Sequence, residues 1–86
     1  MRSRQDPRIA ETLQIGRNII TLYTRGKSPQ QTDRLLHMTQ SQRCYCLREL
    51  KRHLGARTRE ELVLMVIRDE IVRAETLRTA EAEMAG

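Results

Sequence analysis

The sequence has few of the residues that usually fill a core. Its 86 residues include no Trp, no Phe and only two Tyr, so Leu, Ile, Val and Met must provide the burial. A chain of this length has room for one small core, because small domains bury a smaller fraction of their surface. No apolar run approaches a membrane span, and the N-terminus lacks the apolar region of a signal peptide. We therefore expect one soluble, cytoplasmic domain with no membrane partner.

Residues that carry chemistry are equally sparse. Cys44 and Cys46 are two positions apart on a predicted helix, so they point in different directions and cannot bridge each other or form a four-ligand zinc site alone. His37 and His53 are isolated, and there is no Gly-rich phosphate loop. We expect no enzyme, and hence no catalytic residues, metal, cofactor or small-molecule substrate.

Three short segments predict helix starts. Ser28 to Gln31, Thr39 to Gln42 and Thr58 to Glu61 each place a hydroxyl residue three positions before a Gln or Glu, which is the pattern of a capping box. Gly26 and Gly55 stand where helices should end, because Gly enters the left-handed conformation of a C-terminal cap without a Cβ clash. The chain is therefore predicted to be all-α: helix, loop, short helix, turn, helix, loop, long helix.

The predicted elements form a single domain over residues 7–79. Residues 1–6 are expected to be a disordered tail and residues 80–86 a frayed one. The first helix, capped by Asp6 and Pro7, has a weak point at Gly16, where it could bend or divide. The predicted helices run from Pro7 to Gly26, from about Pro29 to Leu36, from about Gln40 to Leu54 and from about 59 to 79.

The third predicted helix has two distinct faces. Leu47, Leu50 and Leu54 recur at helical spacing, and Cys44 would extend this apolar stripe by one turn. The other face carries polar and cationic side chains, which are Tyr45, Arg48 and Arg52.

Charge is distributed unevenly along the chain. Residues 26–59 hold eight basic and two acidic groups, a net +6, whereas residues 60–86 hold three and seven, a net −4. A basic stretch inside a helical domain favours contact with phosphates, and an acidic helix would be repelled by them. The alternative is that the basic stretch is only a solvated surface.

The fourth predicted helix has more apolar surface than one small core can cover. Residues 62–67 are apolar on all sides, so they must be buried on all sides. A stripe at spacings of three and four residues continues beyond them and predicts an interface with a second copy of the chain. Its residues are Leu64, Ile67, Ile71, Ala74 and Leu77. Alternatively, this stripe covers the first helix within the same chain.

Residues 19–63 resemble, without a gap, the helix-turn-helix DNA-binding domain of the LuxR family, which also includes FixJ, NarL and GerE. The matches include Gly26 and Ser28 at the entry to the scaffold helix and Thr39 as the cap of the recognition helix. They continue through the Leu-Gly ending at Leu54 and Gly55. The remaining matches are Ile19, Ile20, Leu22, Tyr23, Leu36, Leu47, Leu50, Arg57, Arg59, Glu61, Leu62 and Val63.

Several positions depart from the family pattern. Thr32 and Asp33 stand where the family has an apolar and a small residue, and Gln42 and Arg43 stand where it has Thr and Val. His37 replaces the turn Gly, which is tolerable because His visits the left-handed region more readily than most residues. Asp33 and Arg43 would meet where the two helices cross. We expect them to form an ion pair, the alternative being that both reach solvent.

The resemblance implies a set of DNA-contacting residues. The third helix would lie in the major groove, with Cys44, Tyr45 and Arg48 at the base-facing positions, although Cys44 also fits core packing. Contacts to the DNA backbone would come from Lys27, Ser28, Thr39, Lys51, Arg52 and Arg57.

Two functions are therefore expected. The first is a small dimeric, DNA-binding transcription regulator of bacterial cytoplasm, associated with the nucleoid. The second is an antagonist that pairs with a larger LuxR-type activator, or with another transcription component, without reading DNA. We expect no receiver or ligand-binding domain ahead of the predicted domain, so its activity would be controlled by its abundance, by a partner, or not at all.

Overall fold

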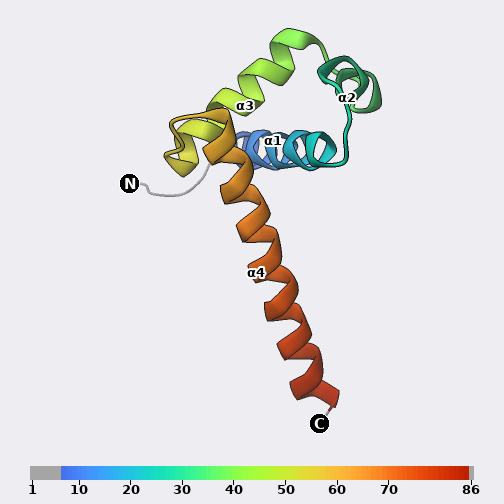
Figure 1. The fold of residues 1–86 in the computed structure, drawn as a ribbon, viewed down its shortest axis with the longest axis vertical. Helices are drawn as coiled ribbons and strands as arrows, with labels where there is room; N and C mark the ends of the chain where they lie inside the picture. The colour runs from blue at the N-terminus through green and yellow to red at the C-terminus, as the bar shows by residue number, and fades with distance from the viewer. Residues whose placement is uncertain (1–6, 86) are drawn as a thin grey trace.

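The computed structural model describes residues 7–85, which form helices joined by short loops. The four helices of this part of the chain are α1 (Pro7–Thr24), α2 (Pro29–Leu35), α3 (Gln40–Leu54) and α4 (Arg59–Ala85). The first three gather at one end of the molecule, and most of α4 projects away from them (Figure 1). The all-α prediction is confirmed, and the predicted tail at residues 1–6, with its cap at Asp6, lies outside the described residues.

The starts of α2 and α3 are set by complete capping boxes. Gln31 N donates to Ser28 Oγ over 3.1 Å, and Ser28 N donates to Gln31 Oε1 over 2.9 Å. Gln42 N donates to Thr39 Oγ1 over 3.1 Å, and Thr39 N donates to Gln42 Oε1 over 2.8 Å. Each box gives side-chain acceptors to two backbone N–H groups that a helix start would otherwise leave unpaired. Both predicted starts are confirmed.

The third predicted box is only half formed. Glu61 N donates to Thr58 Oγ1 over 3.1 Å, but the Glu61 carboxylate accepts from Arg57 N over 2.6 Å rather than from Thr58 N. The carboxylate reaches one residue further back because the chain bends through Arg57 and Thr58 before α4 begins. An acidic side chain at this end still complements the partial positive charge of the helix start.

Within residues 7–85, three residues adopt positive φ where elements end. Gly26 has φ +86° after α1, and Gly55 has φ +72° as the left-handed cap of α3. His37 has φ +54° in the turn between α2 and α3. The left-handed conformation at His37 allows the α2–turn–α3 unit to form without the glycine that such a turn favours.

Gly16 marks a close approach between helices rather than a break in α1. The helix is continuous through this position. A Cβ at Gly16 would lie 3.1 Å from the Cys46 carbonyl oxygen and 3.1 Å from Leu50 Cβ. The missing side chain therefore lets α3 pack directly on the backbone of α1, which corrects the prediction of a bend or division.

The core lies where α1, α3 and the start of α4 meet. It includes Leu13, Ile20, Leu50, Ala56, Leu62 and Val66. Cys46 is buried beside it, whereas Cys44 is exposed, so the predicted extension of the apolar stripe through Cys44 is wrong. The α1–α3 contact explains the difference, because it turns the helix face of Cys46 and Leu50 toward α1.

The helix α4 is longer than predicted and mostly solvent-exposed. It continues through Ala85, over residues 80–85 that were expected to fray. Ala and Glu, which dominate this segment, are among the best helix formers. Only Leu62 and Val66 of α4 are buried. No helix among the described residues has the length and apolar character needed to cross a membrane.

Candidate nucleic-acid interface

The outer face of α3 carries the predicted base-facing residues. Cys44, Tyr45, Arg48 and Arg52 are all exposed, on the side of the helix opposite Cys46 and Leu50. The Tyr45 side chain is 51% exposed although it is large and mostly apolar. The face therefore offers a thiol, a phenol and two guanidinium groups to a partner.

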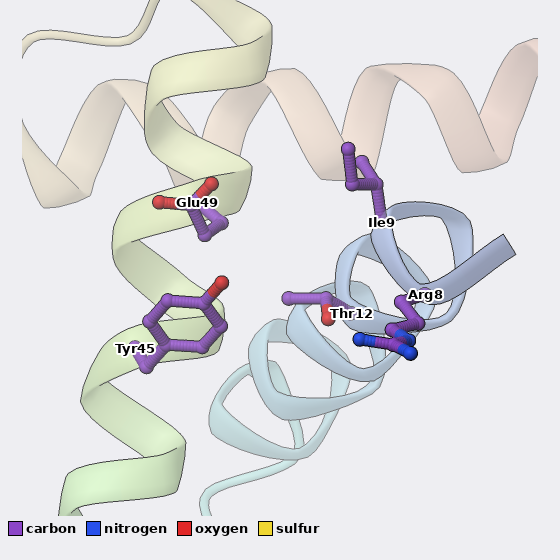
Figure 2. Close-up of a pocket in the computed structure, with 5 residues that line it drawn as sticks. All are labelled: Arg8, Ile9, Thr12, Tyr45 and Glu49. Carbon is purple, nitrogen blue, oxygen red and sulfur yellow. The ribbon is translucent and has the colours of Figure 1, made fainter. Parts of the chain in front are cut away.

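Tyr45 lies at the edge of this face that adjoins α1. Figure 2 shows Tyr45 and Glu49 of α3 facing Thr12, Ile9 and Arg8 of α1 across a small hollow. The hollow has a volume of about 230 Å³. A ligand that contacts Tyr45 would therefore also meet the first turns of α1. No local sequence pattern predicts this hollow, because Arg8 and Tyr45 are far apart along the chain.

The cations on α3 differ in their partners. Arg52 forms an ion pair with Glu49 on the same helix. Arg48 and Lys51 pair with no carboxylate among the described residues. Since an exposed pair partly neutralises its cation, the free positive charge of α3 is concentrated at Arg48 and Lys51.

The predicted backbone-contact residues are distributed over four segments, which are α3 and the three loops that join the helices. Lys27 lies exposed in the α1–α2 loop, Arg57 lies exposed before α4, and Lys51 is half-buried on α3. Ser28 and Thr39 cap α2 and α3, where their oxygens accept from Gln31 N and Gln42 N. A hydroxyl that accepts in a cap keeps its own O–H, which remains available to a phosphate oxygen.

Arg43 and Asp33 lie in contact where α2 and α3 approach each other. Arg43 Nε donates to Asp33 Oδ1 over 2.6 Å, with exposed side-chain fractions of 10% and 18%. Arg43 Nη1 also donates to the hydroxyl of Tyr23 at 3.5 Å. The hydrogen bond to Asp33 raises the pKa of Arg43, outweighing the opposing effect of burial. The two charges that depart from the apolar family pattern are thus placed together and paired.

Tyr23 links this ion pair to α4. The guanidinium carbon of Arg59 stands 5.2 Å from the centre of the Tyr23 ring, a cation–π distance. Tyr23 therefore contacts one arginine with its hydroxyl and another with its ring. Tyr23 and Arg59 both belong to the positions that resemble the LuxR family, but they lie in different helices. The resemblance therefore did not predict that the two side chains would meet.

Thr32 is the least compensated polar residue of the interior. It is fully buried, and its hydroxyl has no hydrogen-bond partner among the described residues. Leaving a buried hydroxyl unpaired costs about 1–3 kcal/mol. The contact between α2 and the rest of the domain is therefore weaker than an apolar residue at this position would make it.

The predicted interface residues of α4 are uncovered. Leu64 and Leu77 are 67% and 65% exposed, and Ile67, Ile71 and Ala74 are also exposed. The alternative, that this stripe covers α1, is wrong because α1 meets the opposite side of α4. On that side Arg17 pairs with Asp69 over 3.2 Å, and Thr21 donates to Glu70 over 3.4 Å.

Comparisons with known protein families, with curated proteins and with solved structures found no match to this chain.

Proposed function

We propose that this protein is a small dimeric transcription regulator that binds double-stranded DNA through a LuxR-type helix-turn-helix. In this proposal α2 is the scaffold helix and α3 the recognition helix. The observation that carries it is the outer face of α3, where Arg48 and Lys51 have no carboxylate partner within residues 7–85, while Arg43 is paired with Asp33 beneath them. Unpaired cations on one helix face suit a polyanion.

The residues of α3 would have different roles in the groove. Arg48 would read guanine through a bidentate contact, and Tyr45 and Cys44 would meet base edges or a phosphate. Lys51 and Arg52 would hold the DNA backbone, together with Lys27, Ser28, Thr39 and Arg57. These backbone contacts position the protein and contribute most of the salt-dependent affinity.

Two copies would associate through α4. The stripe of Leu64, Ile67, Ile71, Ala74 and Leu77 is exposed in the single chain, and exposed apolar patches of this kind usually mark an interface. The net charge of residues 60–86, −4, also directs α4 away from DNA. The dimer would therefore present two recognition helices on the side opposite its acidic helices.

A gel shift on mixed genomic duplexes, at about 50 and about 150 mM salt, tests DNA binding. A protein that reads a site keeps part of its shifted species at the higher salt, whereas a merely basic protein releases all of it. Complete release with every fragment would contradict sequence-specific binding.

The second candidate is an antagonist that captures another transcription regulator. The observation that favours it is the same exposed stripe of α4, which fits an amphipathic helix of a different protein as well as a second copy. A chain that stays monomeric at high micromolar concentration and shifts no duplex would support this candidate.

A further inference from the structure

A hollow that shares Cys44 and Arg48 with the outer face of α3 combines positive charge with an apolar floor. It has a volume of about 260 Å³ and lies between α1, α3 and α4. Its floor is formed by Ile20, Leu47 and Leu62, of which Ile20 and Leu62 are buried core residues. The remaining lining residues are Arg43, Cys44, Arg48, Lys51 and Arg59, and none of the lining residues is acidic.

The charges around this hollow are only partly compensated. Arg43 is paired with Asp33, and Arg59 is satisfied in part by the ring of Tyr23. Arg48 and Lys51 pair with no carboxylate among the described residues. The rim therefore favours an oxyanion, while the floor favours an apolar group. The volume is close to the lower end of the range of about 300–1,000 Å³ for small-ligand pockets.

We propose that this hollow binds a small amphipathic anion, a phosphate monoester or carboxylate with a compact apolar body. The oxyanion would meet Arg48 and Lys51, with Arg59 at the opposite rim, and the apolar body would rest on Leu47 and Leu62. Because the proposed function also assigns Arg48 and Lys51 to DNA, the anion and the duplex would compete. This regulatory part of the inference rests on the proposed function.

Phenyl phosphate is a suitable probe, with inorganic phosphate and phenol as its two halves and benzoate as the carboxylate counterpart. Titration of the full chain, followed by two-dimensional NMR of backbone amides, should give a Kd of about 1 mM for phenyl phosphate, as expected for a ligand of this size. The chemical-shift changes should be largest around Leu47, Lys51 and Leu62. Either half of the probe alone should require at least a tenfold higher concentration to give the same shifts. If benzoate binds as tightly as phenyl phosphate, the site accepts either oxyanion. If only phenyl phosphate binds, the site is restricted to phosphate monoesters.

Lys51→Met retains the aliphatic stem and removes the charge, and should weaken phenyl phosphate about tenfold. Arg78→Met makes the same change of charge on the exposed distal part of α4 and should have no effect. Equal loss in both variants, or equal binding of inorganic phosphate, would overturn the site as nonspecific attraction.

Competition is measured separately, with a labelled duplex at constant ionic strength. Phenyl phosphate should release the duplex, whereas sodium sulfate of the same ionic strength should not. Binding of phenyl phosphate without release would overturn the regulatory part. If the protein binds no duplex at all while the NMR shifts persist, the proposed function fails and the pocket remains.

Discussion

Two regions of this molecule are stabilised by different interactions. Every buried residue of the described chain lies between Leu13 and Val66, whereas each residue from Glu70 to Ala85 is exposed. The first region, which we call the head, is residues 7–66, and the second, the distal helix, is residues 70–85. Packing decides the structure of the head. Helix propensity and local hydrogen bonds, such as Thr76 Oγ1 to Val72 O at 2.9 Å, support the distal helix.

The comparison shows that the distal helix has little tertiary support within the single chain. An isolated helix of about 15 residues is marginal in water even when its sequence favours helix. Its exposed stripe of Ile71, Ala74 and Leu77 is what a second chain would cover. The head, in contrast, should be folded in the monomer and should tolerate damage to the distal helix.

The largest expected effect comes from removing a side chain in the head. Leu50 is fully buried where α1 and α3 cross, so Leu50→Ala should lower the free energy of unfolding by about 4 kcal/mol. Met84→Ala removes a similar volume from the distal helix, where the side chain is exposed. It should change the free energy of unfolding by less than about 0.5 kcal/mol. Urea unfolding followed by circular dichroism measures both. Similar effects in the two variants would contradict the division between the regions.

The next effect concerns the ion pair between Asp33 and Arg43. Either Asp33→Ala or Arg43→Val leaves a mostly buried charge unpaired and should destabilise the head by about 3 kcal/mol. The double variant restores an apolar contact and should be neutral or stabilising, which gives a large coupling energy. Small, additive changes in thermal melts would show that the contact contributes little.

A third substitution tests the distal helix directly. Ile71→Glu places a charge in the exposed stripe and should weaken self-association at least tenfold, because an unpaired charge in an interface is strongly unfavourable. Sedimentation should show a monomer whose head remains folded. A wild-type chain that is already monomeric at high micromolar concentration would contradict the dimer.

The smallest effect distinguishes the two thiols. Cys44 is exposed and Cys46 is buried, and burial raises the pKa of the Cys46 thiol. Since the thiolate is the reactive form, Cys46 should be alkylated about tenfold more slowly than Cys44 at pH 8. The rate at Cys46 should rise further as the pH moves above the ordinary range of a thiol. Mass spectrometry after timed alkylation measures both rates, and equal rates would show that the α1–α3 contact opens readily.

The sequence predicted the features that depend on local chemistry. The capping boxes place the starts of α2 and α3 correctly, because their hydrogen bonds join residues three positions apart. His37 and Gly55 adopt the left-handed conformations expected of them. The Asp33–Arg43 ion pair was predicted from the resemblance to the LuxR family. In that family the two positions face each other where the helices cross, and composition alone does not show which residues of two helices meet.

Most of the features that the sequence did not predict depend on how the helices pack against one another. Spacing along α3 fits either Cys44 or Cys46 as the next turn of the apolar stripe, and the choice is made by α1 at Gly16. The contacts between Arg17 and Asp69 and between Arg59 and Tyr23 join distant residues, so no local pattern marks them. The extent of α4 was underestimated because its last turns lack apolar periodicity, although Ala and Glu favour helix.

The most direct test of the proposed function compares Arg48→Ala with Arg78→Ala on a preferred duplex and a random one. Both variants remove one exposed guanidinium, the first from the outer face of α3 and the second from the distal helix. In titrations of labelled duplex at about 150 mM salt, Arg48→Ala should cost about 1–3 kcal/mol on the preferred duplex and much less on the random one. Arg78→Ala should leave both affinities unchanged. If Arg48→Ala weakens the two duplexes equally, or if both variants behave alike, α3 does not read DNA sequence.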